Sequence, residues 1–194
     1  MPARFSEAAR WLVIAAAVTL SPFAEARTIE IVAIGDSNTA GLFAGRRNAF
    51  PAVLEESLRD AGYDVRIVNR GISGDTTGGM LARLDAQIPR GTDLAIVQGG
   101  YNDGRRGVPA RTRDANVDTI LARLRARGVK VLLCGLDGAR WAAIARSHGA
   151  VLVPGSTCYD VDSRGFDGLH MNRAGHRVVA GRLLPVVKRM IGRP

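Results

Sequence analysis

A hydroxyl and an imidazole that lie far apart in the chain have the clearest chemical potential. Ser37 stands in a tight turn after an apolar segment, and His170 stands three residues after Asp167. An imidazole can accept the proton of a serine hydroxyl while a carboxylate holds its other nitrogen, and a serine so placed is a nucleophile. This pattern predicts acyl transfer, with Ser37 as the nucleophile, His170 as the base and Asp167 as the group that orients the base.

Each of these residues also has an ordinary structural interpretation. A serine at the start of a helix commonly caps that helix, and an Asp-x-x-His pair also occurs at metal sites and at helix ends. The other two histidines are weaker candidates for the base. His176 is expected to cap or pack in the first turn of a C-terminal helix, and His148 precedes an apolar segment at the far edge of the expected sheet.

Acyl transfer also needs hydrogen-bond donors for the negative charge that develops on the carbonyl oxygen. Gly74 stands in a loop that allows close backbone approach, Asn102 carries a side-chain amide, and Ser37 has its own backbone N–H. The ordinary interpretations are a turn glycine and an asparagine that closes a turn. Taken together, the three donors predict an oxyanion hole.

Five short apolar segments alternate with segments of helical character, which is the pattern of a parallel sheet covered on both faces. The expected strands are 28–34, 65–68, 94–97, 130–133 and 150–153, and the expected helices are 51–58, 80–88, 117–124, 141–145 and 172–191. The sequence therefore predicts a single doubly wound domain over residues 27–194. This is a three-layer α/β/α fold with a flavodoxin-like, five-stranded parallel sheet.

In such a sheet, ligands bind outside the carboxyl ends of the strands, where the strand order reverses. Four loops that follow strands carry all the candidate residues: 35–41, 70–77, 99–104 and 166–170. The first loop lacks the Gly-x-Gly-x-x-Gly spacing and a Gly-Lys-Ser/Thr triplet, and Asp36 would repel a phosphate there. The sequence therefore favours an acyl-transfer site at this edge over a nucleotide site.

Four short blocks follow one another along the chain: Gly35-Asp36-Ser37, Gly74, Asn102 and the segment 167–170. Their residue types and order resemble those of the SGNH (GDSL) hydrolases, and most of all the periplasmic arylesterase, lysophospholipase and thioesterase branch of that family. The resemblance implies a serine esterase that acts on small-molecule esters without a cofactor or a metal. It also implies the same triad and the same three oxyanion donors.

The sequence departs from the family pattern in two places. Met171 follows His170 where the family commonly has proline, which should alter the loop slightly and leave the chemistry alone. The segment 135–149 is shorter than in the thioesterase-like relatives, whose longer loops help shape the acyl groove. The resemblance thus implies a more open site for short-chain or aryl esters, with lysophospholipids and thioesters as further substrates.

The segment 1–26 has the order of a secretory signal peptide. Arg4 and Arg10 precede an apolar run at 11–20, and a small-x-small site ends at Ala26. The run is about half the ~20 apolar residues that a membrane span needs. We expect cleavage after Ala26 and a periplasmic or secreted protein; an uncleaved anchor is the alternative.

Cys134 and Cys158 are the two cysteines of the chain, 24 positions apart. An oxidising compartment favours a disulfide between them, and a loop of this size would contribute roughly 3–4 kcal/mol. Two buried thiols that act as small apolar side chains are the alternative.

The composition is that of a globular domain, with 46% hydrophobic and 23% charged residues and a formal net charge of +9. Tyr101, Arg105 and Arg106 are expected at the mouth of the site, and Arg111 and Arg113 follow them. These arginines could attract anionic substrates or an anionic membrane surface, or simply form a solvated loop. Aromatic residues make up 5% of the chain, too few for base-stacking platforms, so no nucleic-acid partner is expected.

Three other functions remain open at this stage. The same scaffold could be an acyltransferase, which passes the acyl group to an alcohol, or a binding module without catalysis. Asp36, Asp103, Asp167 and His170 could instead hold a hard cation. The presence of every side chain that the hydrolase needs favours the ester hydrolase. The oligomeric state is not predicted.

Overall fold

The computed structural model describes residues 27–135 and 138–193, so the expected signal peptide at 1–26 lies outside the described residues. Five strands form one parallel sheet in the order β2-β1-β3-β4-β5. They are β1 (Ile29–Gly35), β2 (Val65–Gly71), β3 (Leu94–Gln98), β4 (Lys130–Gly135) and β5 (Val151–Pro154). This order confirms the predicted flavodoxin-like α/β fold, and it reverses direction between β1 and β3.

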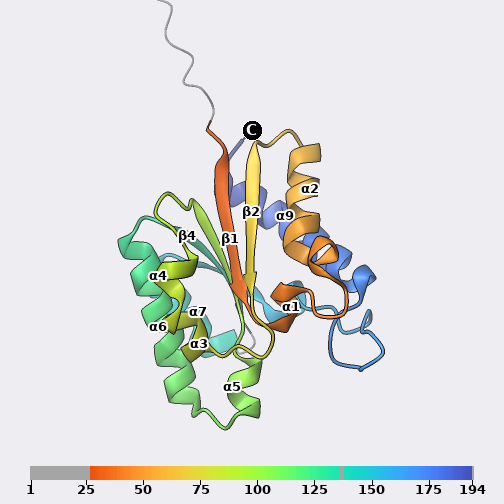
Figure 1. Ribbon diagram of the computed structural model, residues 1–194. Helices are drawn as coiled ribbons and strands as arrows, with labels where there is room; N and C mark the ends of the chain where they lie inside the picture. Colours follow the sequence, from red (N-terminus) through yellow and green to blue (C-terminus); the bar gives the residue numbers. More distant parts are fainter. Residues whose placement is uncertain (1–26, 136–137, 194) are drawn as a thin grey trace, which may run out of the picture.

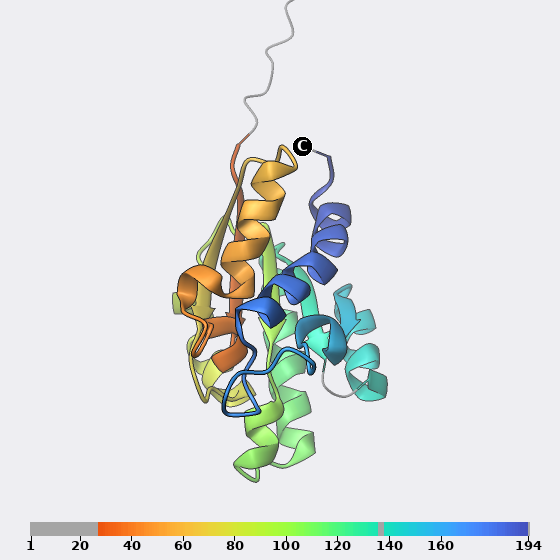
Figure 2. The same ribbon diagram turned by 90° about the vertical axis from the view of Figure 1, so that its right-hand side faces the viewer.

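Both faces of the sheet are buried, because successive strand residues point to opposite faces. On β1, Ile31 and Ala33 pack under one helical layer, and Val32 and Ile34 pack under the other. The first layer consists of α2 (Phe50–Asp60) and α9 (Arg173–Ile191). The second consists of α3 (Thr77–Ala82), α4 (Leu84–Gln87), α6 (Ala110–Ala126) and α7 (Gly138–His148). Figures 1 and 2 show these layers on either side of the sheet.

The helix expected at 117–124 is longer, because α6 already begins at Ala110. The helices differ from the sequence prediction in two further ways. The single helix expected at 80–88 is two short helices, α3 and α4, interrupted at Arg83, whose guanidinium donates to the carbonyl oxygens of Arg70 and Gly35. The structure also adds short helices of four or five residues: α1 (Ser37–Ala40), α5 (Tyr101–Arg105) and α8 (Gly155–Cys158), besides the 3₁₀ turn η1 (Arg46–Asn48). Each is little more than one turn, too short to show a helical period in the sequence.

Helices α1 and α5 begin at the carboxyl ends of β1 and β3, on either side of the point where the strand order reverses. Gly71 at the end of β2 lets α1 lie against the sheet, because a Cβ at that position would be 2.2 Å from the backbone nitrogen of Ala40. Figure 1 shows α1 and α5 at the end of the sheet toward which the strands point, whereas β1 begins and the chain ends at the opposite end.

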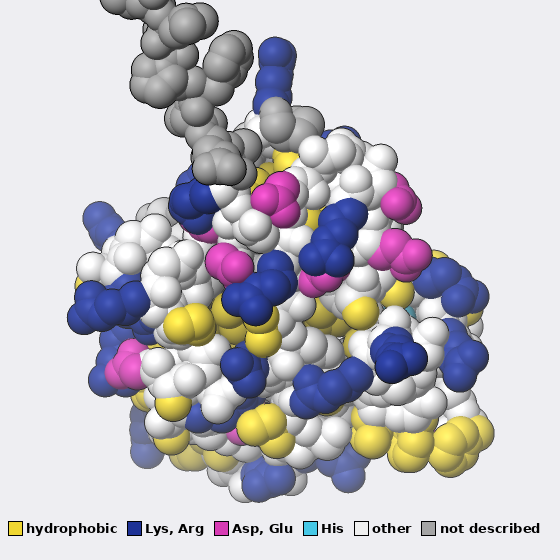
Figure 3. Space-filling model, turned by 45° about the horizontal axis from the view of Figure 1, so that its top comes forward, with side chains coloured by type: hydrophobic (Ala, Val, Ile, Leu, Met, Phe, Trp, Pro, Cys, Tyr) yellow, Lys and Arg dark blue, Asp and Glu magenta, His cyan; other side chains and the backbone are white. Residues whose placement is uncertain are grey.

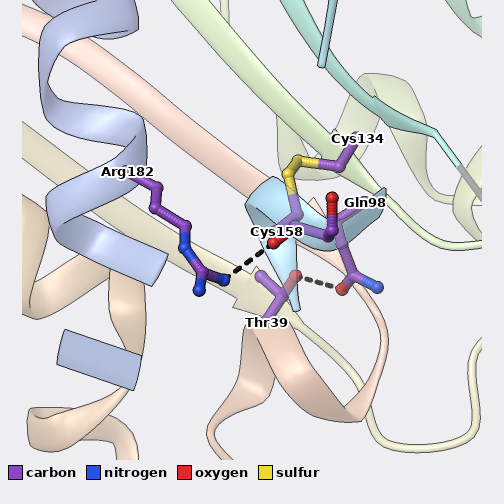
Figure 4. Close-up of a disulfide and its surroundings, with 6 residues drawn as sticks. Thr39, Gln98, Cys134, Cys158 and Arg182 are labelled. Carbon is purple, nitrogen blue, oxygen red and sulfur yellow. Dashed lines mark hydrogen bonds between the residues drawn. A yellow bond between two sulfur atoms is a disulfide. The ribbon is translucent and has the colours of Figure 1, made fainter. Parts of the chain in front are cut away.

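A disulfide joins Cys134 at the end of β4 to Cys158 in α8, so the two cysteines are not free thiols (Figure 4). Both residues are almost fully buried in the layer under α9. Arg182 of α9 donates to the carbonyl oxygen of Ser156, which holds α8 from the other side. The disulfide therefore fixes the start of the segment that leads from β5 to His170.

His176 packs inside the protein, which is one of the two roles predicted for it. It lies fully buried in the first turn of α9, and its Nδ1 accepts the N–H of Phe50. Burial lowers the pKa of His176 to about 4. His148 ends α7 and pairs with the carboxylate of Asp118.

Within residues 27–135 and 138–193, no helix has the length and apolar character that a membrane crossing requires.

Candidate active site

Ser37 is the first residue of α1 and lies almost buried where β1 ends. The carboxylate of Asp36 accepts the N–H of Asn38 and so caps this short helix. Asp36, and not Ser37, is therefore the N-cap of α1, so the hydroxyl of Ser37 can form a hydrogen bond with another group. Its Oγ lies 2.9 Å from Nε2 of His170, which is 133 positions further along the chain.

Asp167 holds the other nitrogen of the imidazole. Its Oδ2 lies 2.5 Å from Nδ1 of His170, and its Oδ1 accepts the N–H groups of Leu169 and His170. These hydrogen bonds, first of all the one from the His170 side chain, lower the pKa of Asp167 to about 2. An ionised Asp167 can only accept a hydrogen bond from Nδ1–H, so Nε2 is the nitrogen that can accept the proton of Ser37.

The segment that carries this pair is held at both ends. Tyr159, next to the disulfide, donates its hydroxyl to the carbonyl oxygen of Leu169. Gly165 donates its N–H to the carbonyl oxygen of His170, 2.7 Å away. Asn172 caps α9 by accepting the N–H groups of Ala174 and Gly175. The backbone before and after His170 is thus held by hydrogen bonds, which fixes the position of the imidazole.

The three expected oxyanion donors line the same cavity as Ser37 and His170. Gly74 has a φ of 76°, a conformation that favours glycine, and within the described chain its N–H and that of Ser37 make no hydrogen bond. Asn102 uses one hydrogen of its Nδ2 on the carbonyl oxygen of Asp75, 2.9 Å away, which leaves the second hydrogen available. The donors therefore converge without being used up by the fold.

The cavity at this edge has a volume of about 470 Å³. Its lining residues are Asp36, Ser37, Asn38, Leu42, Gly74, Gln98, Tyr101, Asn102, Arg105, Tyr159, Leu169 and His170. Side chains of Leu42, Tyr101, Tyr159 and Leu169 make its wall largely apolar. Burial raises the pKa of the Asp36 carboxyl, which lies at the inner end beside Gln98.

The arginines near the mouth have different surroundings. Arg105 lines the cavity with Tyr101, as expected, but Arg106 does not, because it donates to the carbonyl oxygen of Gly74, 2.8 Å away. Arg113 turns inward to Asp114, and Arg111 is exposed. On the face seen in Figure 3, Lys and Arg side chains are spread widely with Asp and Glu among them, not gathered into one patch.

The sequence interpretation missed Phe43, which lies beside the imidazole. Its ring centroid is 5.6 Å from that of His170 in an edge-on contact, and 4.9 Å from that of the exposed Phe166. Phe43 has a φ of 64° and is the one non-glycine residue with a positive φ in the described chain. A bulky side chain in this conformation is strained, and such strain concentrates at functional sites. An aromatic residue after a short helix carries no sequence signal for this role.

The alternative metal site is not formed. The carboxylate of Asp103 is buried against Thr77, whereas that of Asp36 caps α1 and that of Asp167 holds His170. Residues 27–135 and 138–193 contain no group of three or more side chains placed to ligate a metal ion.

The doubly wound fold, with hydroxyl, imidazole and carboxylate in line at its carboxyl edge, defines an ester hydrolase of the SGNH type. The chain belongs to the GDSL-like lipase/acylhydrolase family, whose model matches residues 33–178. The resemblance seen in the sequence is thereby confirmed.

Individual relatives carry esterase names. Esterase TesA of Pseudomonas aeruginosa is 39% identical over 143 residues, which is 70% of each chain. The arylesterase of Vibrio mimicus is 34% identical over 105 residues, which is 54% of this chain and 52% of that protein. A crystal structure of TesA superimposes with a TM-score of 0.73 at 29% identity and covers 83% of this chain and 99% of that one.

Proposed function

We propose that the protein is an exported serine esterase that hydrolyses short-chain or aryl carboxylic esters through an acyl-enzyme intermediate. The observation that carries this proposal is the line from Ser37 Oγ through the imidazole of His170 to Asp167, which opens into a cavity with unused hydrogen-bond donors. This is the arrangement that makes a serine hydroxyl nucleophilic.

In the first half of the reaction, Nε2 of His170 takes the hydroxyl proton as Oγ of Ser37 attacks the ester carbonyl. The negative charge on the carbonyl oxygen is accepted by the N–H groups of Ser37 and Gly74 and by Nδ2 of Asn102. The imidazolium then gives its proton to the leaving alcohol as the bond to the acyl group breaks. An acyl-Ser37 ester and the free alcohol result.

In the second half, His170 takes a proton from water, and the hydroxide attacks the acyl-enzyme. The same donors hold the oxyanion, and His170 returns the proton to Oγ of Ser37 as the carboxylic acid leaves. Asp167 remains ionised throughout and stabilises the imidazolium by its hydrogen bond to Nδ1.

The cavity supports the proposed substrate size. A volume of about 470 Å³ with an apolar wall suits a short acyl chain or an aryl group. A chain-length series of p-nitrophenyl esters, run beside a lysophospholipid and an acyl-CoA, measures this preference. We expect kcat/KM to peak at short chains; a peak at long chains would contradict the proposed substrate range.

Export is supported by the signal-like segment 1–26 and by the buried disulfide, since disulfides persist in oxidising compartments. N-terminal sequencing of the protein recovered from the periplasm or the medium is expected to start at Arg27. Peripheral attraction to an anionic membrane stays a prediction, which binding to anionic vesicles at rising salt would test.

A labelling experiment tests the nucleophile. A fluorophosphonate probe should label the parent protein and the Ser73→Ala control, whose serine is exposed near Gly74, but not Ser37→Ala. The same three proteins should show the same pattern in hydrolysis of p-nitrophenyl acetate. Labelling and turnover of Ser37→Ala at the level of the parent would refute the assignment.

An acyltransferase would use the same residues up to the acyl-enzyme. Product analysis with an added acceptor alcohol separates the two reactions. We expect the free acid to dominate; a product made mainly of the new ester would replace the hydrolase with the transferase.

A further inference from the structure

Helix α5 presents three residues to the cavity. Tyr101, Asn102 and Arg105 all line it, and Arg105 lies three positions after Asn102 and four after Tyr101. These spacings place side chains on one face of a helix. The helix that contributes the oxyanion donor Asn102 therefore also brings a guanidinium to the place where the substrate binds.

The guanidinium of Arg105 has no carboxylate partner among the described residues. Its Cζ lies 6.0 Å from the centroid of the Tyr101 ring, a cation–π distance that holds the side chain along the cavity wall. By contrast, Arg106 is bound to the carbonyl oxygen of Gly74 and Arg113 is paired with Asp114. Arg105 is thus the arginine that lines the cavity, and its donors are open to a ligand.

The other ionisable groups of the cavity leave this charge uncompensated. His170 is committed to Ser37 and Asp167, and the carboxylate of Asp36 is buried and accepts the N–H of Asn38. The side chain of Arg105 is exposed at the mouth of the cavity, so an anionic group can reach its guanidinium from solvent. A guanidinium binds carboxylate and phosphate oxygens through two parallel hydrogen bonds.

We propose that Arg105 forms a subsite for an anionic group, so that the enzyme prefers esters that carry a carboxylate or a phosphate close to the scissile bond. The inference rests on the proposed esterase function and names a substrate class for it. An anion held by Arg105 lies on the same helix face as the oxyanion donor Asn102, so one substrate can contact both.

Pairs of esters that differ in charge test the subsite. For the acyl side, the pair is the mono-p-nitrophenyl ester of glutaric acid and p-nitrophenyl valerate. For the alcohol side, it is 4-acetoxybenzoate and its methyl ester. In the parent, we expect the ratio of kcat/KM for the charged ester to that for the neutral ester to be high in at least one pair, and to fall as salt rises.

Variants then locate the preference. Arg105→Gln should lower that ratio about tenfold, the scale of one hydrogen bond to a charged group. Arg105→Lys, which keeps the charge without the planar fork, should give an intermediate ratio. The matched control is Arg111→Gln, which removes an exposed arginine outside the cavity and should leave the ratio as in the parent.

The outcomes separate the two proposals. An unchanged ratio in Arg105→Gln, or an equal change in Arg111→Gln, overturns the anion subsite. A parent that hydrolyses neutral esters without any preference for charge also overturns it and leaves the esterase standing. A parent that hydrolyses none of the four esters refutes the esterase function itself.

Discussion

The buried carboxylate of Asp103 accepts both the backbone N–H and the hydroxyl of Thr77, at 3.0 and 2.6 Å. Thr77 begins α3, just after the turn of Gly74, and Asp103 follows Asn102 in α5. One carboxylate thereby joins the two segments that carry Gly74 and Asn102, two of the proposed oxyanion donors. Its role is positional, since it lies outside the cavity lining.

Replacing Asp103 with alanine should both destabilise the protein and reduce turnover. The change leaves two buried donors of Thr77 without an acceptor, which costs about 2–4 kcal/mol. Urea denaturation measures the loss. Asp118→Ala, which removes a half-exposed carboxylate paired with His148, is the control and should cost about 1 kcal/mol or less. Equal losses of unfolding free energy in the two variants would contradict the stabilising role of the buried contact between Asp103 and Thr77.

Removing the amide of Asn102 should reduce catalysis more than binding. We expect Asn102→Ala to lower kcat by a factor of about 10²–10³ with a small change in KM, because the oxyanion exists only in the transition state. Steady-state kinetics with p-nitrophenyl acetate measures both constants. Asn48→Ala, whose amide donates to the carbonyl oxygen of Ala44 away from the cavity, should keep the parental kcat. A loss confined to KM would remove Asn102 from the oxyanion hole.

Two substitutions of Phe43 separate backbone strain from the aromatic contact. Phe43→Ala and Phe43→Gly both remove the ring beside His170, so both should lower kcat/KM to a similar extent. The φ of 64° suits glycine and strains alanine, so the glycine variant should be more stable by about 1 kcal/mol. Kinetics and urea denaturation of the pair check this. If both variants kept the parental kcat/KM, the contact between the Phe43 ring and His170 would have no role in catalysis.

The buried His176 should make the protein sensitive to mild acid. Its pKa of about 4 lies below the 6.5 of an exposed histidine, so the unfolded chain binds the proton more tightly. Its contribution is complete above about pH 6.5 and is lost as the pH falls toward 4, on the order of 2–3 kcal/mol. His176→Asn keeps an acceptor for the N–H of Phe50 but does not titrate. The free energy of unfolding of this variant should therefore fall less than that of the parent over this pH range. If the two proteins lost the same unfolding free energy with falling pH, His176 would not be the source of the acid sensitivity.

Loss of the disulfide should destabilise the fold. The double variant Cys134→Ser/Cys158→Ser opens a loop with a sequence separation of 24, which should cost roughly 3–4 kcal/mol. Urea denaturation with and without dithiothreitol measures the effect. Reductant should shift the parent and leave the double variant unchanged; a parent that is indifferent to reductant would mean that the bond adds no stability.

The sheet and its catalytic edge could be predicted from the sequence because both depend on simple patterns. Apolar runs between turn residues mark buried strands, and the carboxyl ends of parallel strands meet at one edge. Ser37 and His170 could therefore be expected to meet, and the structure places them in contact. The end of β2 was harder to predict, since its last residues, 69–71, are polar or glycine and lie on an edge strand.

Side-chain roles that depend on packing could not be predicted. Arg105 and Arg106 are neighbours of the same type, yet one lines the cavity and the other holds the Gly74 turn, because α5 points them to different sides. The sequence marks Asp103 only as a candidate metal ligand, since a lone aspartate does not reveal a partner 26 positions away. Phe43 shows its strain only in its backbone torsion.

The cavity is lined by residues that follow the carboxyl ends of the strands. Figure 1 shows that β1 begins and α9 ends at the opposite end of the sheet. A tether attached at the C-terminus would therefore hold the molecule with its entrance turned away from the support. Immobilisation on a resin, or display on a particle through that end, should leave access for ester substrates unobstructed.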